Sequence, residues 1–562
     1  MSERTGRFAI VEQFLADGMR FMFGNPGTVE QGFLDALGSF PDFHYILTLQ
    51  ETIAVAIADG YARATQRPAV VQLHSGVGLG NGIGMMYQAM RGHAPLVVIN
   101  GDAGVRYGAM DAQMAADLVN MARPVTKWAG YASDPSSVLR LLRRAIKIAA
   151  TPPQGPVYLC LPMDVLDAPN SEPVQPTSIP STRVAPDPIE VEHAAALLAH
   201  ATSPILIIGD GVTWSNAQAE VVRVAELLGA EVWGADSSEV NMAASHPQNR
   251  GLLGHMFGHH SSPITQRADA VLIVGSYVFP EVFPSLEGVF SPGTRVVHVD
   301  LNAYEIAKNF SVDLGLVADP KLTLAQLAVA LERCMPAECK DGAHRRAVAL
   351  AALAAQERTD QRRKDEAGFG LAPISPARFM HDLAERLPKD TVIFDEALTA
   401  SPELVRCMPP DVPGSYFQTR GGSLGVGVPG AIGLKLAHPD KTVVGFSGDG
   451  GSMYTIQALW TAAHYDIGAK FVICNNHSYK LLKLNVQQYW RDTNQPEGEF
   501  PASFDLATPD IRFDTLAQGM GVAAVRVERA QDIGSAIERM LAHDGPFLID
   551  LVVNDLLREQ ER

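Results

Sequence analysis

The chain has 562 residues, of which 47% are hydrophobic and 19% charged, and its formal net charge is −17. This length suits about three or four globular domains. The acidic balance argues against nucleic acid or an anionic membrane as the main partner, because both require basic surface, although one local site can still bind an anionic substrate.

The first third of the chain alternates helix and strand signals. We predict helices over 11–21 and 52–64, strands over 45–49, 69–73 and 96–100, a turn over 24–27 and a glycine-rich turn over 76–84 that opens a helix. Short β-branched strands alternating with helices are typical of a parallel sheet covered on both faces.

Two further α/β units follow. Residues 163–190 are rich in Pro, Ser, Thr and Asp and are predicted to form a linker. The predicted strands of the second unit are 204–209, 270–275 and 295–300, followed by an Ala-rich helix over 341–365; those of the third are 392–394, 443–446 and 471–474. The predicted fold class is α/β, with three doubly wound parallel-sheet domains over 1–175, 186–345 and 370–562.

The strongest motif is a glycine-rich loop in the third unit. The loop Ser447-Gly448-Asp449-Gly450-Gly451-Ser452 follows a strand, and a helix is predicted from about Thr455. Glycines let the backbone approach an anion closely, and a helix N-terminus offers unpaired N–H groups. Asp449 adds a carboxylate of the kind that a hard cation requires. The loop is therefore predicted to bind phosphate together with a divalent metal.

A second half of this site lies downstream. The segment Asn475-Asn476-His477-Ser478-Tyr479 follows the next predicted strand. Ligands of open α/β sheets bind at the carboxyl ends of the strands, so Asn476 is expected beside Asp449, and these oxygen donors suit Mg2+. A lone Gly-Asp-Gly is most often a simple turn, but this one precedes Asn475-Asn476 with 24 residues between. The combination resembles the fingerprint of thiamine diphosphate enzymes, whereas Met453 interrupts a dinucleotide pattern.

Glu51 is the candidate for the carboxylate that thiamine enzymes place against the aminopyrimidine ring. It follows the apolar run 45–50 and opens a helix of small residues, where an isolated glutamate is commonly favoured by the helix dipole. Three neighbouring segments favour the functional interpretation: Asn25-Pro26-Gly27-Thr28, Leu73-His74-Ser75-Gly76 and the glycine-rich run 78–84.

With these motifs the chain resembles the pyruvate oxidase and acetolactate synthase superfamily, and within it the benzoylformate decarboxylases. The resemblance covers essentially the whole chain and is tightest over 25–101, 414–436 and 446–482. It implies a pyrimidine-binding, a central and a diphosphate-binding domain in that order, with thiamine diphosphate and Mg2+ as cofactors. It also implies an active site between two subunits, so that a homodimer is the minimum and a homotetramer is usual.

The resemblance also assigns residues to the cofactor. The metal ligands would be Asp449, Asn476 and the carbonyl of Ser478. The Gly422 carbonyl would hold the pyrimidine amino group, and Leu424, in isolation an ordinary core leucine, would force the two rings into a V. The remaining cofactor-binding residues would be Asn25, Pro26, Gly27, Glu51, Thr399, Gly448, Gly450, Gly451, Ser452 and Tyr479.

The expected catalytic residues are Glu51, His74, Thr28 and Gln113. His74 matches a histidine that the decarboxylases use for proton transfer, although a strand-end hydrogen-bond network is the alternative. Thr28 replaces a serine and keeps its hydroxyl. Two positions depart from the decarboxylases: Val282 stands at the second catalytic histidine, and Gln113 replaces an apolar residue and can hydrogen-bond a substrate oxygen.

Three functions remain open. The first is a decarboxylase of 2-oxo acids with carboligase activity. The second is an acetolactate synthase-like carboligase or a 2-hydroxyacyl or aldehyde lyase acting on hydroxy-ketones, which Gln113 and Val282 favour. The third is an inactive cofactor-binding regulatory protein, which the intact Glu51, Asp449 and Asn476 disfavour.

The cysteines and the N-terminal residues bear on location. The five cysteines are odd in number, are not spaced like a zinc site, and favour free thiols in a reducing compartment. The N-terminal MSERTGRFAI lacks a basic start followed by an apolar run, and no uncharged apolar stretch reaches about 18 residues. We therefore expect a cytoplasmic protein without a membrane or nucleic-acid partner.

Overall fold

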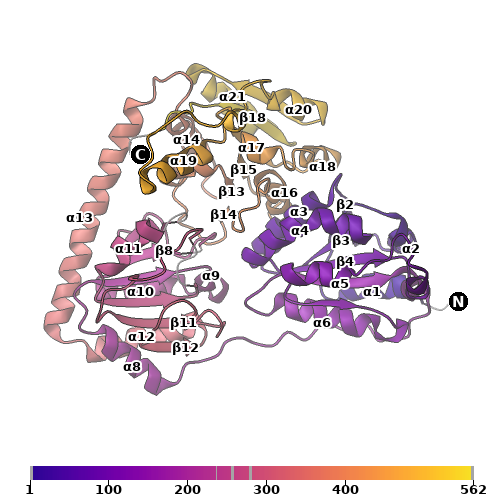
Figure 1. Ribbon diagram of the computed structural model, residues 1–562, viewed down its shortest axis with the longest axis horizontal. Helices are drawn as coiled ribbons and strands as arrows, with labels where there is room; N and C mark the ends of the chain where they lie inside the picture. Colours follow the sequence, from indigo (N-terminus) through magenta and orange to yellow (C-terminus); the bar gives the residue numbers. More distant parts are fainter. Residues whose placement is uncertain (1–3, 236, 255–257, 278–280, 558–562) are drawn as a thin grey trace. The chain divides into compact units, whose positions relative to one another are not determined.

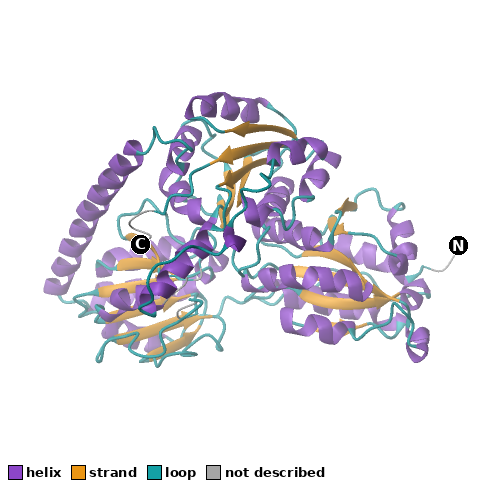
Figure 2. Cartoon of the chain, turned by 45° about the horizontal axis from the view of Figure 1, so that its top comes forward, coloured by secondary structure: helices purple, strands orange, loops and turns teal. Residues whose placement is uncertain are grey.

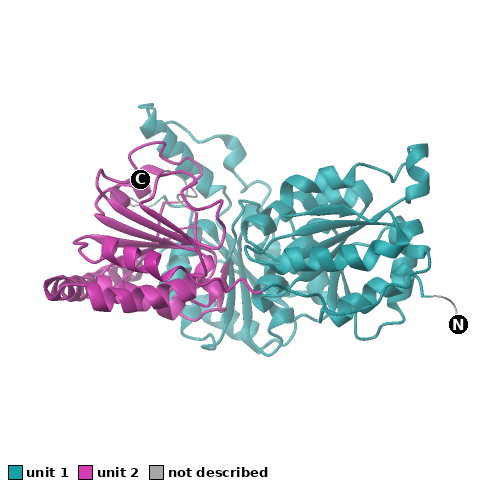
Figure 3. Cartoon of the chain, turned by 90° about the horizontal axis from the view of Figure 1, so that it is seen from below, with its two compact units in different colours: residues 1–180, 368–407, 418–562 teal, residues 181–367, 408–417 magenta. Residues whose placement is uncertain are grey.

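The computed structural model describes residues 4–235, 237–254, 258–277 and 281–557 (Figure 1). It contains three parallel six-stranded sheets, and helices flank each of them (Figure 2). The predicted α/β class is confirmed. The chain divides into two compact units (Figure 3), one with residues 1–180, 368–407 and 418–562 and the other with 181–367 and 408–417.

The first sheet has the strand order β2-β1-β3-β4-β6-β5. Its central strands β3 and β4 are almost fully buried, which is typical of a parallel sheet covered on both faces. The strands are β1 (Phe21–Gly24), β2 (His44–Leu47), β3 (Ala69–His74), β4 (Leu96–Asp102), β5 (Ala129–Tyr131) and β6 (Val157–Pro162). The helices are α1 (Gly6–Ala16), α2 (Gln31–Leu37), α3 (Glu51–Thr65), α4 (Ser75–Arg91), α5 (Leu118–Ala122), α6 (Val138–Ala150) and α7 (Met163–Asp167).

Three predictions in and after this region were wrong in detail. The helix predicted over 11–21 ends at Ala16, because Gly18 turns the chain with a φ of 74°, and Phe21 already belongs to β1. The glycine-rich run predicted as a turn lies inside α4, where its small residues allow close packing. The predicted linker over 163–190 begins with α7 and ends in the next helix.

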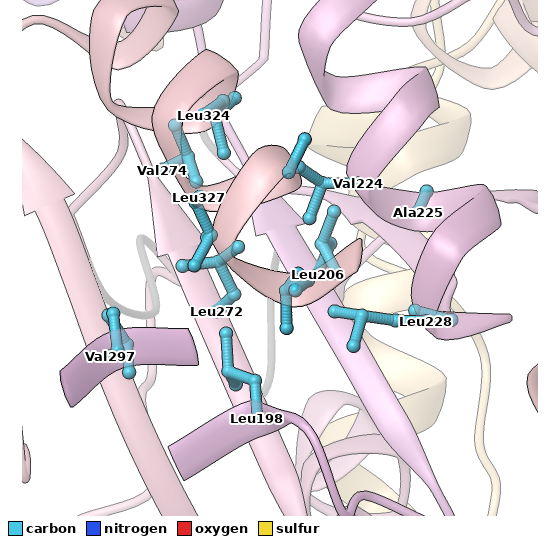
Figure 4. Packing of buried hydrophobic residues seen from close by; sticks show 14 of the residues in the cluster. Leu198, Leu206, Val224, Ala225, Leu228, Leu272, Val274, Val297, Leu324 and Leu327 are labelled. Carbon is cyan, nitrogen blue, oxygen red and sulfur yellow. The ribbon is translucent and has the colours of Figure 1, made fainter. Parts of the chain in front are cut away.

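The second unit holds the sheet β12-β11-β10-β7-β8-β9. Its strands are β7 (Pro204–Ile208), β8 (Glu231–Gly234), β9 (Asn249–Leu252), β10 (Ala270–Val274), β11 (Arg295–Asp300) and β12 (Leu314–Val317). Its helices are α8 (Pro188–Leu198), α9 (Gly211–Ser215), α10 (Gln218–Leu228), α11 (Gly258–Gln266), α12 (Pro320–Cys334) and α13 (Ala337–Ala367). Figure 4 shows the core on one face, where Leu206 and Leu272 of the sheet pack with Leu327 of α12. Burying each such side chain contributes roughly 1.5–3 kcal/mol.

The third sheet has the order β14-β13-β15-β16-β18-β17. Its strands are β13 (Val392–Glu396), β14 (Tyr416–Gln418), β15 (Val443–Gly448), β16 (Lys470–Asn475), β17 (Ala523–Val527) and β18 (Phe547–Val552). Its helices are α14 (Pro376–Ala384), α15 (Ser401–Cys407), α16 (Gly427–Ala437), α17 (Asp449–Ser452), α18 (Ala458–His464), α19 (Lys480–Asp492), α20 (Phe513–Gly519) and α21 (Ile533–Ala542). Among the described residues, no helix is long and apolar enough to cross a membrane.

Helices α3 and α16 join the first and third sheets within one compact unit. Glycines bring the two backbones together: a Cβ on Gly433 would lie 2.1 Å from the Ile57 carbonyl oxygen, and one on Gly60 would lie 2.3 Å from the Gly430 oxygen. The side chain of Tyr465, just after α18, accepts from the Leu47 N–H and donates to the Tyr45 carbonyl. Close packing thus couples the half that carries Glu51 to the half that carries Asp449.

Candidate active site

The metal-binding candidates meet at the carboxyl edge of the third sheet. Strands β15 and β16 are parallel neighbours, with Gly448 opposite Cys474, so the segments that follow them lie side by side. The Asp449 carboxylate accepts from the Gly450 N–H at 2.8 Å and from the Ser478 N–H at 3.2 Å, and the Asn476 side-chain oxygen accepts from the same Ser478 N–H at 3.0 Å. Burial raises the pKa of Asp449 to about 6. A buried carboxylate that is oriented by backbone N–H groups is a suitable ligand for a metal.

The loop itself fits a diphosphate with a hard cation. A Cβ at Gly448 would meet open space, whereas one at Gly450 would lie 2.3 Å from the Tyr479 ring, so the glycine lets the backbone pass against that ring. In the part of the chain that the structure describes, the buried Ser478 hydroxyl has no hydrogen-bond partner. The site offers oxygen atoms, which Mg2+ prefers as ligands, and backbone N–H groups, which donate hydrogen bonds to phosphate. A single helical turn, α17, begins at Asp449, and the helix predicted from about Thr455 is α18, which begins at Ala458.

A buried carboxylate that the sequence did not single out organises the loop with Gly422 and Leu424. Glu396, at the end of β13, accepts from the N–H groups of Gly425 and Gly427 at 2.6 and 2.7 Å and from the Ser447 hydroxyl at 3.1 Å. Burial raises its pKa to about 7. Gly422 has a φ of +78° and open space beside it, so its backbone is accessible to a ligand, and Leu424 is half-buried.

Thr399 lies at the carboxyl edge of the third sheet, near the loop that contains Gly422 and Leu424. Thr399 lies in the short 3-10 turn Leu398–Ala400, directly after β13. The Ser423 hydroxyl donates to the Gly84 carbonyl in α4 at 2.9 Å. The glycine-rich loop and the glycine-rich helix of the first sheet are therefore in direct contact.

Glu51 begins α3 and is only 8% exposed. The Gln50 side chain caps this helix by accepting from the Thr52 N–H. Asn81 of α4 donates to Glu51 Oε2 at 3.0 Å, and a Cβ on Gly78 would lie 2.8 Å from Oε1. The glycine-rich run therefore contributes both the space and the hydrogen bond that the Glu51 carboxylate needs, a role for Asn81 that its sequence context did not reveal.

His74 ends β3 beside the turn that contains Asn25, Pro26 and Gly27. A Cβ on Gly27 would lie 1.9 Å from His74 Nδ1, so only glycine allows this turn to pass over the imidazole. The Asn25 side chain donates to the Thr48 carbonyl at 3.0 Å and so holds the turn in place, while Pro26 and Thr28 are exposed. Gly78 borders both His74 and Glu51, which places these two side chains on one side of the sheet.

Gln113 lies on the segment that follows β4. It is exposed, and the hydroxyl of Ser75, the residue after His74, donates to the neighbouring Met114 carbonyl at 3.2 Å. Ser75 has a positive φ of 48° and thus marks a sharp turn between β3 and α4. This bond ties the Gln113 segment to the His74 turn, a link between positions 39 apart that no local pattern indicates.

The described residues thus form two groups. Glu51, His74, Thr28 and Gln113 lie on the first sheet, and Asp449, Asn476, Ser478 and Tyr479 lie on the third. Within the described residues, the hydrogen bond of the Glu51 carboxylate stays in the first group and those of the Asp449 carboxylate in the second. Val282 lies in the second unit and is 52% exposed, and positions 278–280 beside it are outside the described residues.

Comparison with known families agrees with this arrangement. Residues 4–121 match the model of the thiamine pyrophosphate enzyme N-terminal TPP-binding domain, 191–327 the central domain, and 401–551 the C-terminal TPP-binding domain. The chain belongs to the thiamine pyrophosphate enzyme family.

Similarity to individual relatives defines the class of enzyme more closely. The chain is 32% identical to a benzoylformate decarboxylase of Pseudomonas aeruginosa, over 98% of both chains. It is 28% identical to a probable acetolactate synthase large subunit of Methanocaldococcus jannaschii, covering 98% of this chain and 92% of that one. A solved thiamine diphosphate-dependent 4-hydroxybenzoylformate decarboxylase of Rhodococcus jostii RHA1 superposes with a TM-score of 0.83 at 28% identity, covering 98% of this chain and 99% of that one. The protein is therefore a thiamine diphosphate-dependent decarboxylase or carboligase.

Proposed function

We propose that this chain is a 2-oxo acid decarboxylase of the benzoylformate decarboxylase kind, with carboligase activity as a side reaction. The observation that carries the proposal is the 32% identity to the P. aeruginosa benzoylformate decarboxylase over 98% of both chains. His74, which that resemblance assigns to catalysis, borders Gly78 together with Glu51, and Gly27, the residue before Thr28, packs on its imidazole. The substrate in this proposal is a small 2-oxo acid, with an aromatic one preferred.

The third sheet holds the cofactor's charged end in this proposal. Asp449, the Asn476 side-chain oxygen and the Ser478 carbonyl would bind Mg2+. The diphosphate would lie against Thr399 and the loop Gly448, Gly450, Gly451 and Ser452, with Tyr479 packed behind Gly450. The buried Asp449 carboxylate supports this assignment, because a cation would compensate the burial that raises its pKa.

The first sheet and the loop after β14 would hold the pyrimidine end. The Gly422 carbonyl would accept from the amino group, Leu424 would fill the space between the rings, and Glu51 would hold a proton at a ring nitrogen. When bound, thiamine diphosphate supplies the nucleophilic carbon and the electron sink for cleavage next to a carbonyl. The Asn25-Pro26-Gly27 turn would shield this end of the site from water.

Proton transfer to and from the substrate would belong to His74. An imidazole can both donate and accept a proton, and the Thr28 hydroxyl would orient the substrate carboxylate or carbonyl. Gln113 would hydrogen-bond a substrate oxygen. Leu482, which is 41% exposed, would offer apolar surface to a substrate ring.

The test is CO2 release by the purified protein with thiamine diphosphate and Mg2+, across a panel of 2-oxo acids. We expect benzoylformate or a ring-substituted analogue to be decarboxylated with the highest kcat/KM and pyruvate more slowly. The proposal fails if aromatic 2-oxo acids release no CO2 while pyruvate is converted to acetolactate. It also fails if no 2-oxo acid is turned over by protein shown to bind the cofactor, which is the result expected of an inactive regulatory protein.

A second candidate is an acetolactate synthase-like carboligase or an aldehyde or 2-hydroxyacyl lyase. Gln113 favours it, because this polar side chain is exposed beside the His74 turn rather than forming an apolar wall. Val282 favours it as well, because an apolar residue stands where the decarboxylases have their second catalytic histidine. The same incubations analysed for hydroxy-ketones would separate the two candidates.

The assembly in this proposal is at least a homodimer and usually a homotetramer, with Glu51 of one subunit serving cofactor held by the third sheet of another. Glu51 and Asp449 make their hydrogen bonds in separate groups, and a shared site would bring the Glu51 group of one subunit to the Asp449 group of another. A cytoplasmic location completes the proposal, on the sequence grounds given above.

A further inference from the structure

Glu30 is a buried glutamate that lies outside the sequence motifs and has no role in the proposed function. It ends the 3-10 turn Thr28–Glu30 and is 5% exposed. Its Oε2 lies 2.9 Å from His74 Nδ1, and its Oε1 accepts from the Gly101 N–H at 3.0 Å. Both carboxylate oxygens are thus occupied, one by the backbone of β4 and one by the imidazole.

We propose that Glu30 is the positioning residue of His74, holding the imidazole in one orientation with the proton on Nδ1 and leaving Nε2 for the substrate. This inference rests on the proposed role of His74 as the group that moves protons. Glu30 itself acts through the histidine.

Hydrogen-bond chemistry determines the tautomer. An imidazole is a stronger base than a carboxylate, so the proton between Nδ1 and Oε2 resides on Nδ1, which donates. The Gly101 N–H comes from a strand backbone and cannot turn away, so Oε1 stays committed to it. The Gly27 backbone packs on the imidazole and prevents it from rotating out of this bond. The remaining ring nitrogen, Nε2, is then the atom free to exchange a proton with substrate.

The environment of the Glu30–His74 hydrogen bond influences the charge state of Glu30. Burial raises the pKa of Glu30 above its ordinary value, and the hydrogen bond and charge of His74 oppose that shift. Among the described residues, the titratable groups that interact with the pair include Tyr45 of β2, Cys160 of β6 and Glu51, which borders His74 through Gly78. Burial raises the pKa of Tyr45 and of Cys160, so neither loses its proton in the neutral range. A change of the pH profile on altering Glu30 therefore reports on the Glu30–His74 pair.

Glu30→Gln is the sharpest variant, because it keeps the shape and removes the charge. An amide has one accepting oxygen, which remains on the Gly101 N–H, so its NH2 group faces Nδ1 and the histidine proton moves to Nε2. We expect kcat/KM to fall on the order of 100-fold, with the KM changed much less than kcat, and the pH profile of kcat/KM to change because a buried titratable carboxyl is removed. Cofactor affinity and Tm should stay near those of the wild type.

The matched control is Glu172→Gln. Glu172 is also a buried carboxylate of the same sheet domain that accepts from backbone N–H groups, those of Leu139 and Arg140, and it does not contact His74. It should leave kcat, KM and the pH profile unchanged. If Glu30→Gln behaves like this control, or if it lowers activity only by lowering Tm or cofactor affinity, the positioning role is wrong.

A double-mutant cycle and a spectroscopic measurement complete the test. In a His74→Ala background, Glu30→Gln should cause no further loss of kcat/KM; an equal, independent loss overturns the inference. Solid-state 15N spectra of histidine-labelled holoenzyme, with His74 assigned by difference from His74→Gln, should show a protonated Nδ1 in the wild type and a protonated Nε2 in Glu30→Gln. If His74→Ala alone leaves turnover unchanged, the proposed function of His74 fails, whereas an unaltered tautomer in Glu30→Gln contradicts the Glu30 inference itself.

Discussion

At the scale of single residues, buried carboxylates at strand ends carry most of the candidate site. Asp449 accepts from backbone N–H groups, Glu51 receives one bond from Asn81, and Glu396 receives bonds from Gly425, Gly427 and Ser447. In the proposed function the same chemical group would therefore serve as a metal ligand at Asp449 and a proton holder at Glu51, whereas at Glu396 it clamps a loop.

Glu396 predicts a pH dependence of stability. Its pKa in the native protein is about 7, above the ordinary value of 4.5, so the native state keeps this proton over a range where the unfolded chain has lost it. The stabilisation is complete below pH 4.5 and is lost as the pH rises towards 7, at no more than about 1.4 kcal/mol per pH unit. The cofactor-free wild type should therefore lose Tm relative to Glu396→Gln between pH 5 and 7.

Thermal unfolding of both proteins, followed by fluorescence at several pH values, measures this difference. Because Glu396→Gln cannot titrate, every other ionisable group cancels in the comparison. A difference in Tm that is constant or that grows in favour of the wild type as the pH rises would contradict the assignment.

At the scale of secondary structure, the contact between α3 and α16 depends on glycine. A Cβ on Gly433 would lie 2.1 Å from the Ile57 oxygen and 2.6 Å from the Tyr61 nitrogen, both of which are backbone atoms within a helix. The two helices would have to separate, and with them the Glu51 end of α3 and the α16 helix that follows the Leu424 loop. Backbone proximity at this crossing thus fixes the first and third sheets of one chain against each other.

We expect Gly433→Ala to lower stability by about 3 kcal/mol or more, because neither backbone can yield as a flexible side chain would. Gly519→Ala is the matched control: a Cβ there meets open space at the end of α20, and alanine favours a helix by up to about 1 kcal/mol. Urea or thermal unfolding should show a large loss for the first variant and none for the second. Equal stabilities would mean that the crossing tolerates a side chain.

At the scale of the whole molecule, the proposed shared site makes a prediction about mixed subunits. Glu51→Gln and Asp449→Asn should each be inactive, the first with thiamine diphosphate still bound and the second with weakened metal and cofactor binding. If each site takes Glu51 from one subunit and Asp449 from its partner, a hybrid dimer has one site with both defects and one intact site. Co-expressing the two variants in equal amounts should restore about a quarter of wild-type activity.

The measurement is kcat per subunit of the co-expressed protein, with each variant alone as the baseline. A site built within a single chain predicts no recovery, because every chain then carries a defect in its own site. Light scattering on the same samples reports whether the assembly is a dimer or a tetramer.

The alternation of short apolar strands with helices determined the α/β class from the sequence alone, because each element depends on local periodicity. The proximity of the Gly448–Ser452 loop to Asn476 could also be predicted from the sequence, because segments that follow neighbouring parallel strands emerge at one edge of a sheet. Where local patterns misled, as at Phe21 and in the glycine-rich start of α4, packing against neighbouring elements decided the outcome.

Only the tertiary structure paired Glu30 with His74, 44 positions apart, and Glu396 with Gly427, 31 positions apart. The tertiary structure alone also brought Gly433 against the backbone of Ile57, because nothing in either helical sequence indicates that the two helices are in contact. A sequence determines which chemical groups are available and the hydrophobic periodicity of each segment. It does not state which distant groups come together, because those contacts follow from burying helix faces and completing buried hydrogen bonds across the whole fold.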